Sequence, residues 1–161
     1  MPAIKTILYC TDMGEHMRPV LRFTIDMARQ HEAKIIMLHV IEPLNSGVLV
    51  AFDAYIPKHN AAEMIKDGIK TTLETMQQRL NNFCDEEKMD NSSDCSLFSK
   101  VKAVSGHSAE TIVHQAEKLK AELIVVGSHT NPSLNSGFIG STARKVTQLS
   151  KIPVLVIPVY E

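Results

Sequence analysis

Two turns carry residues that could bind a ligand: one is rich in glycine and hydroxyl side chains, and the other carries a carboxylate. The longer turn follows the apolar run Glu122 to Val126, starts as Gly127-Ser128-His129-Thr130 and ends as Gly140-Ser141-Thr142, where a helical pattern begins. Glycine lets the backbone approach a ligand closely, and the N–H groups at a helix N-terminus attract anions. Those amides and the hydroxyls of Ser141 and Thr142 would form a phosphate site. Gly-Ser-Thr is also an ordinary helix cap, and the spacing leaves both readings open.

The second turn, Cys10-Thr11-Asp12-Met13-Gly14, follows another apolar run and carries a carboxylate. Asp12 could accept a hydrogen bond from a sugar hydroxyl or an adenine amine, or hold a metal ion. It could equally cap the helix that follows. The turn has a single glycine, so it is neither a dinucleotide fingerprint nor a Walker A loop.

The sequence shows no clear motif for a metal site or for nucleophilic catalysis. The histidines and cysteines do not form the paired spacings typical of zinc sites, and no GxSxG elbow is present. His39 lies in an apolar run and is interpreted as a core histidine, whereas His129 could donate to a phosphate. Cys10 has no identifiable base nearby, which favours an inert buried thiol. Arg144 and Lys145 either neutralise phosphates or decorate a helix surface.

Strand and helix patterns alternate along the whole chain and must position these turns. Short continuous apolar runs are typical of parallel strands covered on both faces. The expected strands are Ile7–Tyr9 with its flanks, 34–40, 97–104, 122–126 and 152–159. Helical spacing is expected from Met17, over Ala62–Phe83, after Gly106 with Ser108 as N-cap, and from Ser141 or Thr142. This order predicts a doubly wound α/β sheet, whose ligands bind at the carboxyl ends of the strands.

Bulk composition narrows the class of protein. The 161 residues suit one domain, residues 1–161, and the 17 basic and 18 acidic side chains give no electrostatic pull toward nucleic acid or anionic lipid. No signal peptide and no apolar run near the ~20 residues of a membrane span is visible. The three cysteines are expected to be reduced thiols. A cytoplasmic protein without nucleic acid or membrane partners is therefore expected.

Two stretches interrupt the regular pattern. The connection 42–60 is long and carries the apolar arm Val48 to Tyr55, and a loop of this length in a compact domain is usually functional. The stretch 85–94 is polar and acidic and is expected to be a solvated connector.

The motifs together resemble the universal stress protein family. The spacing Gly127-x-x-Thr130, nine residues, Gly140-Ser141 is similar to the family's glycine–two–glycine–nine–glycine–serine/threonine pattern. The opening Ile7 to Asp12, the segment Lys34 to Pro43 and the closing Pro153 to Pro158 are similar as well. The resemblance implies the adenine-nucleotide α-hydrolase-like fold: a five-stranded parallel sheet in an α/β sandwich, commonly dimeric through its last strand.

The resemblance also implies a nucleotide site in this chain, because part of the family binds ATP. Asp12 would lie near the nucleoside, and Mg carried by ATP could reach it. Val40 would lie near the adenine. Thr130 departs from the pattern, since its Cβ and hydroxyl replace the second glycine and could crowd a phosphate or donate to it. The full implied set is Thr11, Asp12, Val40, Val126, Gly127, His129, Thr130, Gly140, Ser141 and Thr142.

Three functions follow from this resemblance. The first is an ATP-binding regulatory homodimer in the stress response, paired through the apolar strand Ile152 to Pro158. The second is slow ATP hydrolysis at the same site, although no water-positioning base is identifiable. The third is a protein that binds no nucleotide, because Thr130 blocks the loop, and that acts through protein contacts such as the arm Val48 to Tyr55.

Overall fold

The computed structural model describes residues 3–43, 54, 61–86, 95–128 and 138–159. His129, Thr130 and nearly all of the arm Val48 to Tyr55 lie outside the described residues, so the expectations about them stay predictions.

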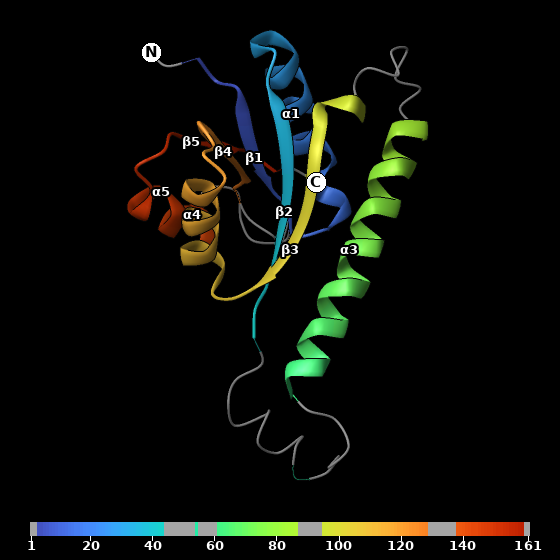
Figure 1. The fold of residues 1–161 in the computed structure, drawn as a ribbon. Helices are drawn as coiled ribbons and strands as arrows, with labels where there is room; N and C mark the ends of the chain where they lie inside the picture. Colours follow the sequence, from blue (N-terminus) through green and yellow to red (C-terminus); the bar gives the residue numbers. More distant parts are fainter. Residues whose placement is uncertain (1–2, 44–53, 55–60, 87–94, 129–137, 160–161) are drawn as a thin grey trace.

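Five parallel strands form one twisted sheet (Figure 1). Their order in space is β3-β2-β1-β4-β5, so the chain starts in the middle, moves to one edge and then crosses to the other side of β1. The point where the strand order reverses lies between β1 and β4. Ligands in sheets of this kind bind at that point, beyond the carboxyl ends of the strands. The strands are β1 Thr6–Cys10, β2 Lys34–Ile41, β3 Phe98–Ser105, β4 Leu123–Gly127 and β5 Val154–Ile157.

Helices cover both faces of the sheet, with α1 and α3 on one side and α4 and α5 on the other (Figure 1). Alternate residues of β1 point to the two cores: Ile7 and Tyr9 pack toward α1 and α3, and Leu8 and Cys10 toward α4 and α5. This two-sided burial is why β1, β2 and β4 are nearly continuous apolar runs, whereas the edge strand β3 also carries polar residues. The helices are α1 Arg18–His31, α3 Ala61–Glu86, α4 Ser108–Lys118 and α5 Ser141–Leu149, with the short 3-10 turns η1 Glu15–Met17 and η2 Cys95–Leu97.

The predicted doubly wound α/β sheet is confirmed, with small differences at element ends. The last strand is shorter than expected, because only Val154–Ile157 pairs with β4. The expected N-cap Ser108 is the first residue of α4, and His107 is the N-cap without a side-chain hydrogen bond. The Ser108 hydroxyl instead donates to Oε1 of Glu42 at 2.7 Å.

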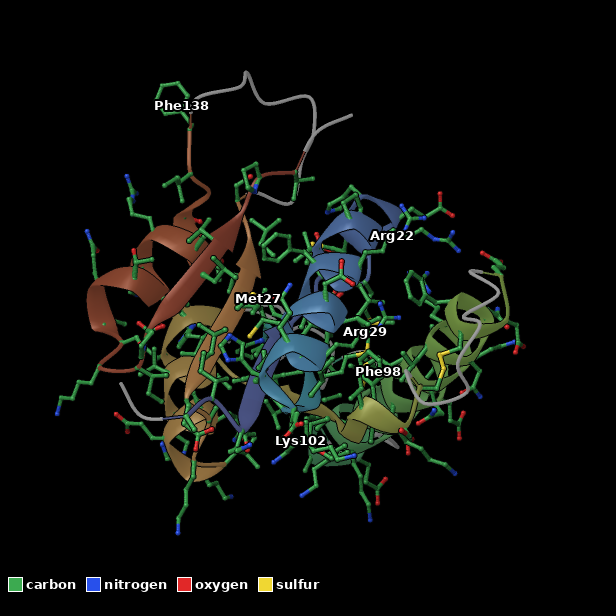
Figure 2. All side chains as sticks on the ribbon, turned by 90° about the horizontal axis from the view of Figure 1, so that it is seen from above. Arg22, Met27, Arg29, Phe98, Lys102 and Phe138 are labelled. Atoms are coloured by element: carbon green, nitrogen blue, oxygen red, sulfur yellow. A yellow bond between two sulfur atoms is a disulfide. The ribbon has the colours of Figure 1, made fainter. Side chains whose placement is uncertain are left out.

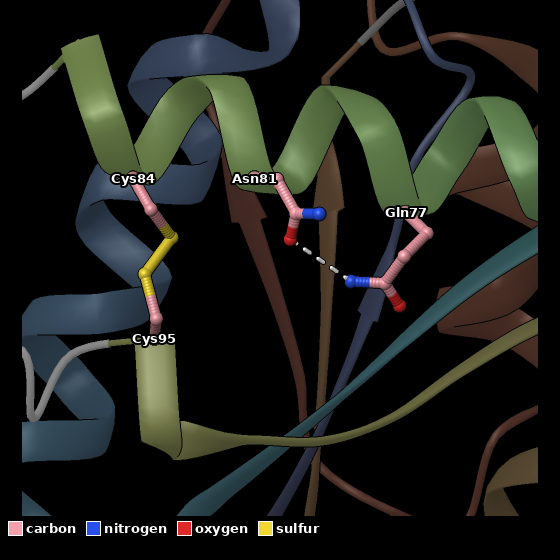
Figure 3. Close-up of a disulfide and its surroundings, with 4 residues drawn as sticks. All are labelled: Gln77, Asn81, Cys84 and Cys95. Atoms are coloured by element: carbon pink, nitrogen blue, oxygen red, sulfur yellow. Dashed lines mark hydrogen bonds between the residues drawn. A yellow bond between two sulfur atoms is a disulfide. The ribbon is translucent and has the colours of Figure 1, made fainter.

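A disulfide joins Cys84, near the end of α3, to Cys95 in η2 (Figure 3). The expectation of three reduced thiols is therefore wrong for this pair, and Cys10 alone is a free thiol. The two Cα atoms lie 6.3 Å apart, within the usual range for a disulfide. Cysteine spacing could not predict the pair, because the approach depends on how α3 returns across the sheet to the start of β3.

Within the described residues, no helix combines the length and the apolar character that crossing a membrane requires.

Candidate functional site

A cleft of about 150 Å³ opens where the strand order reverses. Its walls come from the carboxyl ends of β1, β2 and β4 and from the first turns of α4 and α5. The topology alone places these segments together, since all five strands are parallel and their carboxyl ends meet at one edge.

The turn after β1 presents Asp12 to this cleft in a fixed conformation. The Thr11 hydroxyl accepts a hydrogen bond from the Met13 N–H at 2.9 Å, and Asp12 Oδ1 accepts one from the Gly14 N–H at 2.8 Å. Oδ2 of Asp12 lies 2.8 Å from Nε2 of His16. Met13 adopts a left-handed conformation with φ 68°, which these contacts stabilise. Asp12 therefore braces its own turn while it also lines the cleft.

The first turn of α5 supplies amide donors to the same cleft. The Arg144 N–H donates to the Gly140 carbonyl, and Gly140, the N-cap, contributes no side chain. The N–H groups of Ser141, Thr142 and Ala143 precede the first intrahelical donor. All three residues line the cleft, and the helix dipole adds partial positive charge there.

A second helix also begins at this cleft. Ser108 and Ile112 of α4 line it, opposite Leu38 and Val40 of β2. The cleft is thus apolar between α4 and β2 and rich in donors at α5, which suits a ligand with an apolar ring at one end and anionic groups at the other.

Ser128 connects the elements that hold α5 in place. Its carbonyl accepts from the Gly140 N–H at 2.6 Å, its N–H donates to the Ile157 carbonyl, and its hydroxyl accepts from the Val159 N–H. Ser128 lines the cleft as well, so its contacts fix the start of α5 relative to β4 and β5.

Gly127 leaves little space for a side chain, because Met17 and Val159 pack closely against it. A Cβ at this position would lie 3.0 Å from Sδ of Met17 and 3.1 Å from Cγ2 of Val159. Both contacts are tighter than ordinary van der Waals separation. The close approach here is therefore to a core methionine that also lines the cleft.

The structure brings most of the expected site residues together. The residues that line this one cleft are Thr11, Asp12, Val40, Val126, Gly127, Gly140, Ser141 and Thr142. His129 and Thr130 belong to the part of the chain that the structure leaves undescribed. Sequence reasoning missed Ser128, Met17 and Ile112 as lining residues and placed His39 in the core, whereas His39 also lines the cleft, with Nδ1 donating to the Thr11 carbonyl at 2.7 Å.

The charges near the cleft are few. Asp12 is the only carboxylate among its described lining residues. Lys145 forms an exposed ion pair with Glu110 of α4, which supports the surface reading of this lysine. Burial raises the pKa of the Cys10 thiol, so this cysteine stays protonated and unreactive, in line with its expected inert role.

No group of three or more acidic, histidine or cysteine side chains arranged to hold a metal ion occurs within the described ranges.

Comparison with known proteins gives the same fold and the same family. Universal stress protein MJ0577 of Methanocaldococcus jannaschii is 28% identical over 162 residues, covering 95% of this chain and 94% of the relative. The solved structure of MJ0577 has a TM-score of 0.69 and covers 97% of this chain and 96% of that chain. The structure of UspA from Lactobacillus plantarum has a TM-score of 0.71 at 19% identity, with 98% and 99% covered.

One similar solved structure contains a nucleotide. It is a universal stress protein in complex with cAMP, with a TM-score of 0.56 at 18% identity and 98% of both chains covered. The model of the universal stress protein family matches residues 3–158. This chain belongs to the universal stress protein family.

Proposed function

We propose that the cleft binds ATP and that the chain acts as a nucleotide-responsive regulator. One observation carries this proposal: the first residues of α5, whose amides have no acceptor within the helix, line the same cleft as Asp12, at the point where the strand order reverses. Anions bind at helix N-termini, and nucleotides bind at this point in doubly wound sheets. The cAMP complex of a protein with this fold supports an adenine nucleotide as the ligand class.

Each part of the cleft has a role in this proposal. The apolar walls of α4 and β2, with Val40, would hold the adenine ring. Asp12 would accept from a ribose hydroxyl, in competition with the His16 contact at Oδ2. Ser141, Thr142 and the Ala143 amide would donate to the phosphates. The phosphate contacts expected of His129 and Thr130 remain predictions, because both residues lie outside the described part of the chain.

Magnesium fits this cleft as an ion carried by the nucleotide. Asp12 is the one carboxylate among the described lining residues, and both of its oxygens already have partners. A dedicated Mg²⁺ site uses more oxygen ligands than this. Phosphate oxygens would supply most of the ligands, and Asp12 would contribute at most one.

Binding without rapid hydrolysis is the form of the proposal that the described residues support. Phosphoryl transfer to water needs a group that orients the nucleophile and charges that stabilise the transition state. Among the described lining residues, Asp12 is the one acidic group, and it is engaged with its own turn. Hydrolysis therefore enters the proposal only as a slow side reaction.

We also propose that two chains pair through β5. This strand is at the edge of the sheet, and Val154, Leu155 and Val156 are each only partly buried. Exposed apolar edges promote pairing with another chain. Phe138 projects away from α5 (Figure 2) and is 81% exposed, which adds an exposed apolar side chain outside the sheet. Light scattering tests this proposal, and a monomer at micromolar concentration would contradict it.

The nucleotide proposal is tested by calorimetric titration of the purified chain with ATP and cAMP, each with and without Mg²⁺. An independent test is to release any bound nucleotide from the purified protein with acid and to identify it by chromatography. Thr142→Ala should weaken ATP binding, because Thr142 lines the cleft and its hydroxyl is a proposed phosphate donor. Thr147→Ala is the matched control, since its hydroxyl donates to the Arg144 carbonyl in the same helix, outside the cleft.

The alternative function, a protein that binds no nucleotide and acts through protein contacts, makes a different prediction. If no adenine nucleotide binds up to millimolar concentration, the proposal is wrong. If Thr130→Gly then creates ATP binding, the native threonine blocks the loop, and the chain acts through protein contacts.

A further inference from the structure

A second cavity, of about 250 Å³, lies on the opposite face of the sheet from α4 and α5. It opens to solvent and is lined by the end of β1, the turn that follows it, the start of α1 and the second half of α3. This cavity is larger than the proposed nucleotide cleft, and nothing in the proposed function uses it.

The floor of the cavity is apolar and rich in sulfur. Met37 and Met76 are buried there, beside Leu80 and Phe83 of α3 and Tyr9 of β1. Methionine side chains adapt to irregular shapes and make favourable contacts with aromatic rings. An apolar cavity of ~150 Å³ is enough to bind benzene, so this floor has room for a ring or a branched aliphatic side chain and a short polar group beyond it.

Four charged side chains line the cavity, and two of them neutralise each other. Arg18 forms an ion pair with Glu86, and its guanidinium lies 5.7 Å from the centre of the Phe83 ring. Within the described residues, the remaining two, Glu15 and Arg79, take part in no ion pair with each other or with a third group. The lining of the cavity therefore includes one negative and one positive group that do not pair with each other.

The same turn positions both of these unpaired charges. Arg79 donates to the Met13 carbonyl, and Glu15 follows two residues later at the start of η1. The guanidinium has five N–H donors, so its bond to one carbonyl leaves donors for a ligand carboxylate. Glu15 is exposed and lines the same cavity.

We propose that this cavity binds one free apolar α-amino acid, such as phenylalanine or leucine. Its carboxylate lies against Arg79, its ammonium against Glu15 and its side chain against the methionine-rich floor. This charge pattern discriminates against ligands that carry only one of the two charges, because one charge of the cavity lining then stays unpaired.

Methionine methyl groups provide a direct test. The chain has eight methionines, and Met13, Met37 and Met76 line this cavity but not the nucleotide cleft. Met27 on α1, labelled in Figure 2, packs against the core without lining the cavity and serves as the internal control. Methyl-labelled protein without nucleotide is titrated with phenylalanine, 3-phenylpropionate and 2-phenylethylamine near pH 7.

Phenylalanine should shift the three cavity methyl signals saturably and leave Met27 unchanged. It should bind about fivefold more tightly than either singly charged analogue, as expected for one exposed charge pair. Equal affinity for all three compounds would overturn the charge assignment. Absence of saturable shifts at millimolar concentration, or shifts that include Met27 equally, would overturn the site.

Variants assign each charge separately. Arg79→Gln should remove the advantage of phenylalanine over 2-phenylethylamine, Arg79→Lys should restore part of it, and Glu15→Gln should remove the advantage over 3-phenylpropionate. Arg29→Gln is the matched control, because Arg29 pairs with Asp26 on α1 and does not line the cavity. If Arg79→Gln does not fold, the comparison of the three compounds on the native chain still decides the question. This outcome is independent of ATP binding, since no nucleotide is present.

Discussion

The imidazole of His16 lies against the carboxylate of Asp12, with Nε2 2.8 Å from Oδ2. Gly14, between them in sequence, makes room for this contact. A Cβ on Gly14 would lie 2.1 Å from Cε1 of His16, so any larger residue would displace the ring. The acidic group expected to bind the nucleoside is therefore partly occupied by a side chain of its own turn.

This contact predicts competition between His16 and a ribose hydroxyl. His16→Ala should free Oδ2 of Asp12 and strengthen ATP binding by a few-fold, about the value of one exposed charged contact. Binding of 2′,3′-dideoxy-ATP should not change, because that compound lacks the competing hydroxyls. Calorimetry on both nucleotides checks this expectation.

Gly14→Ala gives a second route to the same result, since it displaces the His16 ring without removing it. If both variants bind ATP as the native chain does, Asp12 does not contact the ribose. Asp12→Ala would then be expected to leave the difference between ATP and its dideoxy analogue unchanged.

Two glycine-to-alanine substitutions should change stability in opposite directions. At Gly127 the new methyl group would press on Met17 and Val159, and overpacking of this kind costs about 1–3 kcal/mol. Gly68 lies inside α3, and a Cβ there meets nothing within 4 Å. Gly68→Ala should therefore raise the free energy of unfolding by about 1 kcal/mol, through helix propensity.

Chemical denaturation of both variants tests this pair. Gly127→Ala should also weaken nucleotide binding, because Met17 lines the cleft, while Gly68→Ala should leave binding unchanged. A Gly127→Ala variant as stable as the native chain would show that Met17 moves aside without cost.

The pattern of apolar runs was sufficient to predict the sheet and its strand-helix alternation. It also predicted that the turns after β1 and β4 become neighbours, because parallel strands bring their carboxyl ends together. The full set of eight described residues that share the cleft, including Val40, came from the family resemblance. The long helix α3 was equally predictable, because apolar residues repeat at helical spacing from Ile65 to Phe83, within Ala61–Glu86.

Features that depend on how elements meet were not readable from the sequence. The bonds of Ser128 to Gly140, Ile157 and Val159 require the register of β4 against β5. The second cavity is formed by residues such as Met76, whose position on the helical stripe indicates only a core residue. Pairing of Cys84 with Cys95 likewise depends on where α3 ends relative to β3.

The pH dependence of stability should include a contribution from Cys10. Burial raises the pKa of its thiol above the ordinary range of a cysteine, so the unfolded chain releases this proton at lower pH than the folded chain. Above about pH 9 the folded state binds more protons than the unfolded state, and the free energy of unfolding falls as pH rises. Below that pH the contribution is fully present.

Replacement of this thiol should flatten the alkaline side of the profile. Between about pH 8 and pH 10, the free energy of unfolding of Cys10→Ala should fall by about 1–2 kcal/mol less than that of the native chain. Burial also raises the pKa of Tyr9, but Tyr9 is present in both proteins, so the difference between their profiles isolates Cys10. Denaturation of the oxidised proteins across this range measures it, and parallel profiles would show that the thiol does not titrate differently on folding.

The disulfide should stabilise the oxidised chain against unfolding. It links residues 11 apart in sequence, and closure of a loop of this length lowers the entropy of the unfolded chain by an amount worth roughly 2–3 kcal/mol. For a chain of this size each kcal/mol corresponds to roughly 2–4 °C in Tm. Cys84→Ser should therefore lower the Tm by roughly 5–10 °C.

Reduction of the native protein with dithiothreitol should reproduce that loss, and it should have no effect on Cys84→Ser. Cys10→Ala, which keeps the bridge, should respond to the reductant as the native chain does. The bridge ties down the end of the helix whose Arg79 holds the Met13 carbonyl and whose Glu86 pairs with Arg18. Breaking it should therefore also loosen the second cavity, so the methyl signals of Met13 and Met76 should broaden in Cys84→Ser, whereas that of Met27 should not.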